Sequence, residues 1–125
     1  MDKLIINSTY STPQVNFDPD AGLLEVKGRL IPEDPENFFT PIINWIDNFK
    51  PAKNSKIILR FKLLYYNTSS AKRVLSILKQ FDQLFIGGSD IKIVWEYEEG
   101  DEDTMQDGED YKKMLKVPFE TKTVA

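Results

Sequence analysis

Apolar and polar residues alternate along three stretches of the chain, a two-residue period typical of strands with one buried face. These stretches are residues 22–30, 55–67 and 90–99, and residues 13–18 precede the first as its hairpin partner across a turn. In the strongest stretch one side comprises Ile57, Leu59, Phe61, Leu63 and Tyr65. Charged residues occupy the opposite sides. We therefore expect a sheet that is covered on one face and wet, or only partly covered, on the other.

Two further stretches repeat their apolar residues at helical spacing. In residues 32–50 the expected inner face comprises Phe38, Ile42, Trp45, Ile46 and Phe49. Start signals at Pro35 and at Pro41 leave two possibilities, a helix from Pro41 or one helix distorted there. In residues 70–88 the expected inner face comprises Val74, Ile77, Leu78, Phe81 and Leu84. Gly87 and Gly88 would then provide a left-handed helix end.

The predicted order is strand, strand, helix, strand, helix, strand, a weak helix near residues 111–115, and a closing edge strand at residues 117–124. Strand–helix–strand crossovers are right-handed, so both main helices should lie on the same face of the sheet. The sequence therefore predicts one α/β domain spanning residues 1–125. It would consist of a mixed sheet, two main helices on one face and a third short helix.

The composition narrows the possible functions. The chain has 125 residues, no cysteine and no histidine, so it lacks disulfides, thiolate metal sites and the commonest general base. A net charge of −4 argues against a nucleic-acid surface, which needs clustered cations. No stretch approaches the roughly 20 apolar residues of a membrane span. We expect a cytoplasmic protein without cofactor, and carboxylate pairs such as Glu33 and Asp34 are expected to be surface charge, not a catalytic pair.

An acidic segment at residues 98–110 raises the question of a calcium site. An EF-hand loop needs oxygen ligands at its third and twelfth positions and glycine at its sixth. Counted from Asp103, the third and twelfth positions are Met105 and Met114; counted from Asp101, the sixth is Gln106. The pattern fails in both registers. We expect a solvated, mobile loop without a metal, and a contact with a basic partner remains an alternative role for it.

The junction between the third strand and the second helix reads YYNTSSAKRV (residues 65–74) and holds three consecutive hydroxyls, Thr68, Ser69 and Ser70. One interpretation is a helix cap, in which a hydroxyl accepts a hydrogen bond from a free backbone N–H. The other is a phosphorylation site, because a helix N-terminus accommodates a phosphate. Lys72 would lie one turn further on, where it could answer the added charge. Both interpretations remain open on these residues alone.

Other residues around this junction are candidates for contact with a protein partner. Tyr65 and Tyr66 should point to opposite faces of the strand end, so one of them should lie near the surface. Leu75 falls outside the apolar stripe of its helix and could dock a partner. An enzyme is not expected, since no nucleophile, phosphate-binding glycine loop or metal pattern accompanies the carboxylates.

The junction also resembles a known family. NTSS at residues 67–70, preceded by LLYYN and followed by AK, is similar to the SiaC family of bacterial regulatory phosphoproteins, whose shape is that of the STAS-fold anti-sigma-factor antagonists. Further similar stretches are STP at 11–13, FDPDAGLLEVKG at 17–28, PE at 32–33, FFTPIINWIDNF at 38–49, GG at 87–88, WEY at 95–97 and PF at 118–119. The resemblance covers nearly the whole chain.

The resemblance implies a partner-switching protein. A serine/threonine kinase would phosphorylate Thr68, with Ser69 or Ser70 as alternates, and a metal-dependent serine/threonine phosphatase would remove the phosphate. The unmodified form would bind an effector, such as a diguanylate cyclase, and promote synthesis of cyclic di-GMP and so regulate biofilm formation. Tyr66, Asn67, Ser69, Lys72 and Leu75 would contact that partner. The alternative is a constitutive interaction or scaffold domain in which residues 68–70 only cap the helix.

Overall fold

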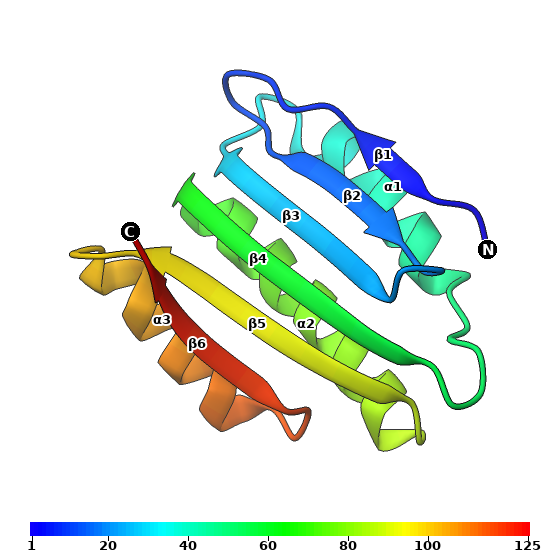
Figure 1. Cartoon of the computed structure of the whole chain (residues 1–125). Coiled ribbons are helices and arrows are strands. Elements are labelled where there is room, and N and C mark those ends of the chain that lie inside the picture. The colour runs from blue at the N-terminus through cyan, green and yellow to red at the C-terminus, as the bar shows by residue number, and fades with distance from the viewer.

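The computed structural model describes residues 1–125, with one six-stranded sheet and three helices (Figure 1). The strands are β1 Leu4–Ile6, β2 Gln14–Asp18, β3 Leu23–Leu30, β4 Lys56–Tyr66, β5 Asp90–Glu98 and β6 Phe119–Val124. The helices are α1 Pro35–Asp47, α2 Thr68–Ile86 and α3 Glu102–Met114. Spatial order follows chain order from β1 to β6. None of the helices has the length and apolar character needed to cross a bilayer.

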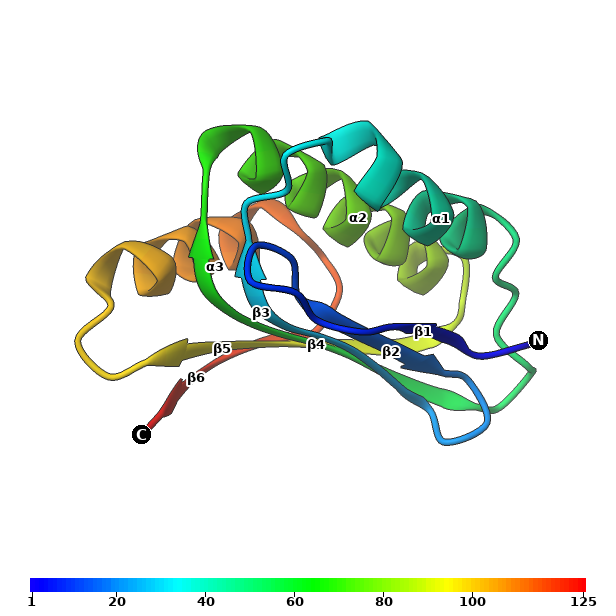
Figure 2. The same ribbon diagram turned by 90° about the horizontal axis from the view of Figure 1, so that it is seen from above.

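The sheet is mixed. β1, β2 and β3 pair antiparallel, whereas β3, β4, β5 and β6 run parallel, each joined to the next by a helix. Figure 2 shows all three helices on one face, with the other face bare. The predicted mixed α/β fold, helices on one face, is confirmed. Because the parallel strands share a direction, the ends of β3, β4 and β5 and the starts of α2 and α3 gather at one edge, here called the carboxyl edge.

The core lies between the sheet and the helices and contains 24 buried residues. Most predicted inner positions of β4 and α2 are confirmed there, namely Ile57, Leu59, Phe61, Leu63, Val74, Ile77, Leu78 and Phe81. Two are not: Leu84 is only partly buried and Tyr65 is exposed. In α1 the expected Ile42, Trp45 and Ile46 are buried, but Phe39 is buried in place of the expected Phe38, which is only half-buried. The helix begins at Pro35, with Asp34 as its cap, and continues through Pro41. Phe39 lies three residues before Ile42 and seven before Ile46, so these three side chains share one face of the helix.

Two elements differ from the sequence prediction. β1 was not predicted; it pairs with β2, and the Trp45 indole N–H donates to the Asp2 carbonyl 2.9 Å away, which anchors the N-terminal segment. The acidic segment is not a mobile loop: residues from Glu102 onward form α3, so the expected weak helix at 111–115 is the end of a longer one. Asp101 caps α3 by accepting from the Thr104 N–H at 3.1 Å.

The end of β4 also differs from the prediction. Strict alternation put Tyr65 on the core face, but the pairing with β3 shifts between Gly28 and Arg29, so Leu63 pairs with Gly28 and Tyr65 with Arg29. A β-bulge of this kind adds one residue to one strand and reverses the facing of the residues beyond it. Leu64 and Tyr65 are therefore both exposed, and Tyr66 turns toward the core.

Candidate functional site

The cap of α2 is Asn67. Its side-chain oxygen accepts from the Ser70 N–H at 2.9 Å, and its backbone carbonyl accepts from the Ala71 N–H at 2.9 Å. Thr68 is the first residue of the helix proper. The interpretation of residues 68–70 as the cap is therefore wrong, because the neighbouring amide already does that work. Sequence reasoning missed this role, although asparagine is among the strongest capping residues.

The three hydroxyls at this junction differ in access. Thr68 and Ser69 are exposed, and neither side chain makes a hydrogen bond within the chain. Ser70 is completely buried, and its hydroxyl has no hydrogen-bond partner. An enzyme can reach the first two in the folded protein, whereas modification of Ser70 would require the first turn of α2 to unfold.

The surroundings of Thr68 favour an added anion. The first turn of α2 contains no acidic residue, and its free N–H groups carry partial positive charge. Lys72 is exposed one turn further on, on the side of the helix that Thr68 occupies. Arg73 also lies near this end, but its guanidinium already contacts Glu36 of α1 at 3.7 Å and lies over the Phe39 ring. Lys72 is thus the cation left free to meet a phosphate.

Tyr66, one of the predicted contact residues, is turned inward. Its hydroxyl donates to the Asp107 carboxylate of α3, and its ring lies edge-on to Trp95, with centroids 6.3 Å apart. Burial, and next the Asp107 carboxylate, raise the pKa of Tyr66 well above its ordinary value. The side chain therefore ties α3 to the β4–α2 junction. It thus stabilises the start of α2 from the interior of the protein instead of contacting a partner.

The other predicted contact residues are distributed unevenly. Ser69 and Lys72 lie on the surface beside Thr68. Asn67 is exposed, but its side chain is engaged as the cap. Leu75 is half-buried and packs against the core, so only part of it is available to a partner. Of the predicted contact residues, Ser69 and Lys72 are therefore free to touch a partner. Tyr66, Asn67 and Leu75 instead make contacts within the chain, Leu75 with only part of its side chain.

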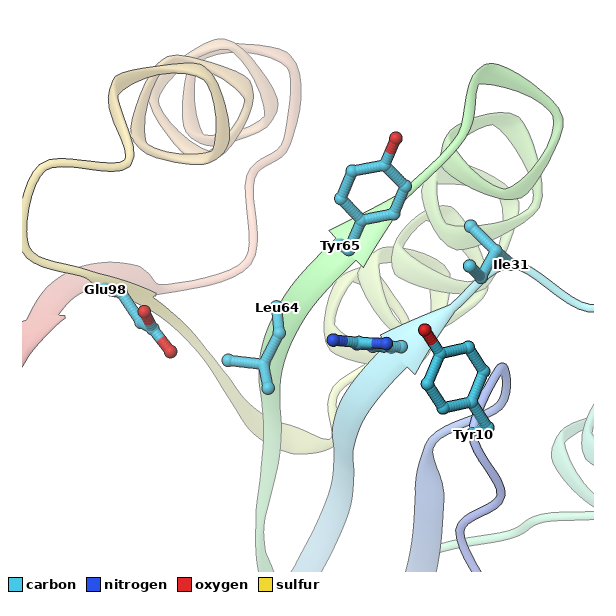
Figure 3. A pocket seen from close by; sticks show the side chains of 6 residues that line it. Tyr10, Ile31, Leu64, Tyr65 and Glu98 are labelled. Carbon is cyan, nitrogen blue, oxygen red and sulfur yellow. The ribbon is translucent and has the colours of Figure 1, made fainter.

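A hollow of about 470 Å³ lies on the bare face of the sheet at the carboxyl edge. Its lining comprises Tyr10, Arg29, Ile31, Leu64, Tyr65 and Glu98. Figure 3 shows Leu64 and Tyr65 at the end of β4, where the chain turns into α2, and Tyr10 on the loop before β2. The alternating pattern of β4 did not predict this hollow. The signal was the run LLYY, in which four consecutive large residues interrupt the alternation of β4.

Comparison with known proteins gives consistent matches over nearly the whole chain. The model of the family described as SiaC family regulatory phosphoprotein matches residues 6–124. A protein of Pseudomonas aeruginosa (strain UCBPP-PA14) is 31% identical over 119 residues, which make up 95% of this chain and 94% of that protein.

Solved structures from Pseudomonas aeruginosa have the same fold. SiaC is 29% identical, with a TM-score of 0.87, over 99% of this chain and 100% of that one. A structure of the diguanylate cyclase SiaD in complex with its activator SiaC contains a chain that is 30% identical, with a TM-score of 0.88, over 97% of this chain and 99% of that one.

Proposed function

The chain belongs to the SiaC family of regulatory phosphoproteins, and from this we propose that it activates a diguanylate cyclase while Thr68 carries no phosphate. Phosphorylation of Thr68 would release the cyclase and lower the synthesis of cyclic di-GMP, and through it biofilm formation. The related SiaC of Pseudomonas aeruginosa is described as the activator of the cyclase SiaD. A serine/threonine kinase and a metal-dependent phosphatase would set the state of Thr68.

One observation carries this proposal. The Thr68 hydroxyl is exposed and free of hydrogen bonds at the first position of α2, because Asn67 already caps the helix. A phosphate on this oxygen would displace no structural contact. Its charge of about −1.5 to −2 would lie against the positive end of α2, within reach of Lys72.

The effect of the phosphate would fall on the partner. A cyclase surface packed on the start of α2 would have to desolvate the phosphate or move away, and both cost free energy. Ser69 and Lys72 would contact the partner directly. The conformation of that surface would be stabilised by Tyr66, Asn67 and Leu75. Ser69 is the alternate acceptor that an enzyme could reach without unfolding the helix.

We further propose that the protein has no catalytic activity of its own and that residues 1–125 act as one functional unit in the cytoplasm. The chain contains neither histidine, the commonest general base, nor cysteine, the most nucleophilic side chain. Its output would be the activity of the enzyme it binds.

The test is a cyclase assay with the SiaD-like diguanylate cyclase of the same organism. The wild-type protein is expected to raise the rate of cyclic di-GMP formation, and Thr68→Glu is expected to abolish both activation and binding with an unchanged melting temperature. Ser76→Glu adds the same charge on an exposed position two turns along α2 and should activate normally. Full activation by Thr68→Glu would contradict the proposal.

A second test asks whether the modification occurs. Intact-mass spectrometry of the protein purified from its native host should reveal a form carrying one phosphate, and fragmentation should place it on Thr68. A phosphate found only on another residue would remove Thr68 as the control point.

A further inference from the structure

We propose that the partner docks in a groove on the bare face of the sheet and that it does so with an acidic amphipathic segment. The open-face groove, as we name it, is lined by Tyr10, Arg29, Ile31, Leu64, Tyr65 and Glu98, and Glu98 lies beyond Leu64, on the side away from Tyr10 (Figure 3). This inference rests on the proposed function and assigns to it a surface on the opposite side of the sheet from the helices.

The groove depends on the bulge in β4. An unbroken strand would direct only one of Leu64 and Tyr65 outward, whereas the shift opposite Gly28 exposes them at 43% and 62%. Tyr10 is 82% exposed on the facing loop. Bulges are frequent next to binding sites because they redirect side chains. Three large exposed residues thus meet on a sheet face that elsewhere carries charged residues such as Arg60 and Lys92.

The charge inside the groove specifies the occupant. The chain has three arginines, and Arg60 and Arg73 both contact carboxylates. Arg29 has no acidic partner; its guanidinium lies over the Tyr10 ring, 4.8 Å from the centroid. A second hollow of about 440 Å³ shares Tyr10, Arg29 and Leu64 with the first and adds Lys27. The groove therefore has its apolar residues Leu64 and Tyr65 beside the Glu98 carboxylate at one side. At the other side lie Arg29 and Lys27, which form no ion pair within the chain.

The shape of the groove favours a stretch of polypeptide. The two hollows adjoin through shared residues, so together they form one open depression that extends from Tyr65 at the end of β4 to Lys27 on β3. A segment with apolar side chains at one end and carboxylates at the other would match both ends.

The groove lies next to Thr68, the proposed phosphorylation site, along the chain. Tyr65 is three residues from Thr68, and β4 leads directly into α2 (Figure 3). A partner with carboxylates on Arg29 and Lys27 would also be attracted to the positive end of α2. Adding about two negative charges at Thr68 would repel that acidic segment. The composition of the groove thus explains why a phosphate would expel this partner.

The experiment measures binding of the same cyclase to the full-length protein. We expect Arg29→Glu and Tyr65→Ala each to weaken binding at least tenfold, with unchanged circular dichroism. The matched controls are Lys122→Glu, an exposed cation on β6, and Ile86→Ala, an exposed apolar residue at the far end of α2. Both controls should bind within twofold of wild type. Increasing salt should weaken the wild-type complex and affect Arg29→Gln less.

The outcomes separate this inference from the proposed function. If the wild-type protein binds the cyclase, Thr68→Glu does not, and both groove variants bind normally, the groove assignment is wrong and the switch stands. If the wild-type protein does not bind the cyclase, the proposed function is wrong, and the groove inference, which rests on it, is overturned with it. If Tyr65→Ala abolishes only a concentration-dependent dimer of this chain, the groove is a self-contact and the inference is overturned.

Discussion

Asn67 and Thr68 divide two tasks between adjacent side chains. The Asn67 amide fixes the start of α2, and the Thr68 hydroxyl is left without a structural partner. A capping side chain contributes about 1 kcal/mol to stability, mainly by satisfying an otherwise free N–H. The consequence is that folding and modification depend on different residues of the same turn.

This division can be measured by denaturation. Asn67→Ala should lower the free energy of unfolding by about 1 kcal/mol, because the Ser70 N–H loses its acceptor. Thr68→Ala should change it by no more than a few tenths of a kcal/mol, since no hydrogen bond is lost. Urea titrations followed by circular dichroism would measure both variants. Equal losses would mean that Thr68 has a structural role after all.

Tyr111 makes stability depend on alkaline pH. Burial, and then the carboxylates Asp107 and Asp110, raise the pKa of Tyr111 to about 12 from an ordinary value of about 10. Between these values the unfolded chain has released the proton and the folded chain still holds it. The free energy of unfolding is therefore unaffected by Tyr111 below about pH 10, and it falls as the pH rises toward 12.

The expected effect at pH 11 follows from the two pKa values. Relative to pH 8, the wild type should lose about 1 kcal/mol more unfolding free energy than Tyr111→Phe, which has no ionisable group at this position. Urea titrations at both pH values would measure the difference. An identical loss in the two proteins would contradict the assignment.

At the scale of the element, α3 is held by very few residues. Only Thr104, Gly108 and Tyr111 are buried, and Gly108 lies directly against Trp95, whose indole N–H donates to the Thr104 carbonyl at 2.9 Å. A methyl group at position 108 would overlap the Trp95 ring. The approach of this helix to β5 therefore requires glycine at that position.

Gly108→Ala tests the packing of α3. Alanine is the better helix former by about 1 kcal/mol, but the overlap with Trp95 should outweigh this and leave a net destabilisation of 1 kcal/mol or more. Gln106→Ala changes an exposed position of the same helix and should be close to neutral. Thermal unfolding with tryptophan fluorescence would distinguish them, and a stabilised Gly108→Ala would contradict the packing argument.

The predictability of each element follows its buried pattern. β3, β4, β5 and α2 could be predicted because a regular period of buried residues runs along each. β1 has three residues and too few positions to establish a period. α3 buries only three residues, so its acidic first turns show no helical period and were predicted as a loop. Glu102 and Asp103 are nevertheless favourable at a helix start. The bulge at Leu64 was missed because it breaks the period used to find strands.

At the scale of the molecule, the chain order of the strands determines where a site can form. A parallel sheet whose order reverses opens a crevice at the reversal. Here β3 to β6 follow in sequence and all helices cover one face, so there is no reversal (Figure 1). Candidate sites are instead the carboxyl edge and the bare face. The Thr68 surface occupies the first and the open-face groove borders both.

Thr68 is exposed and does not belong to the core, so phosphorylation should leave the core unchanged. Amide hydrogen exchange of the modified and unmodified proteins should agree throughout the strands, with differences confined to about residues 65–76. Widespread loss of protection in β3, β4 and β5 would indicate that the phosphate disrupts the fold instead of the contact with a partner.

The capping of α2 by Asn67 also has a consequence for genetics. Variants that mimic or block modification at position 68 should accumulate to equal levels in living cells, because quality-control proteases respond to unfolding and neither variant promotes it. A difference in phenotype between two such alleles would then report signal flow through the pathway and not protein abundance.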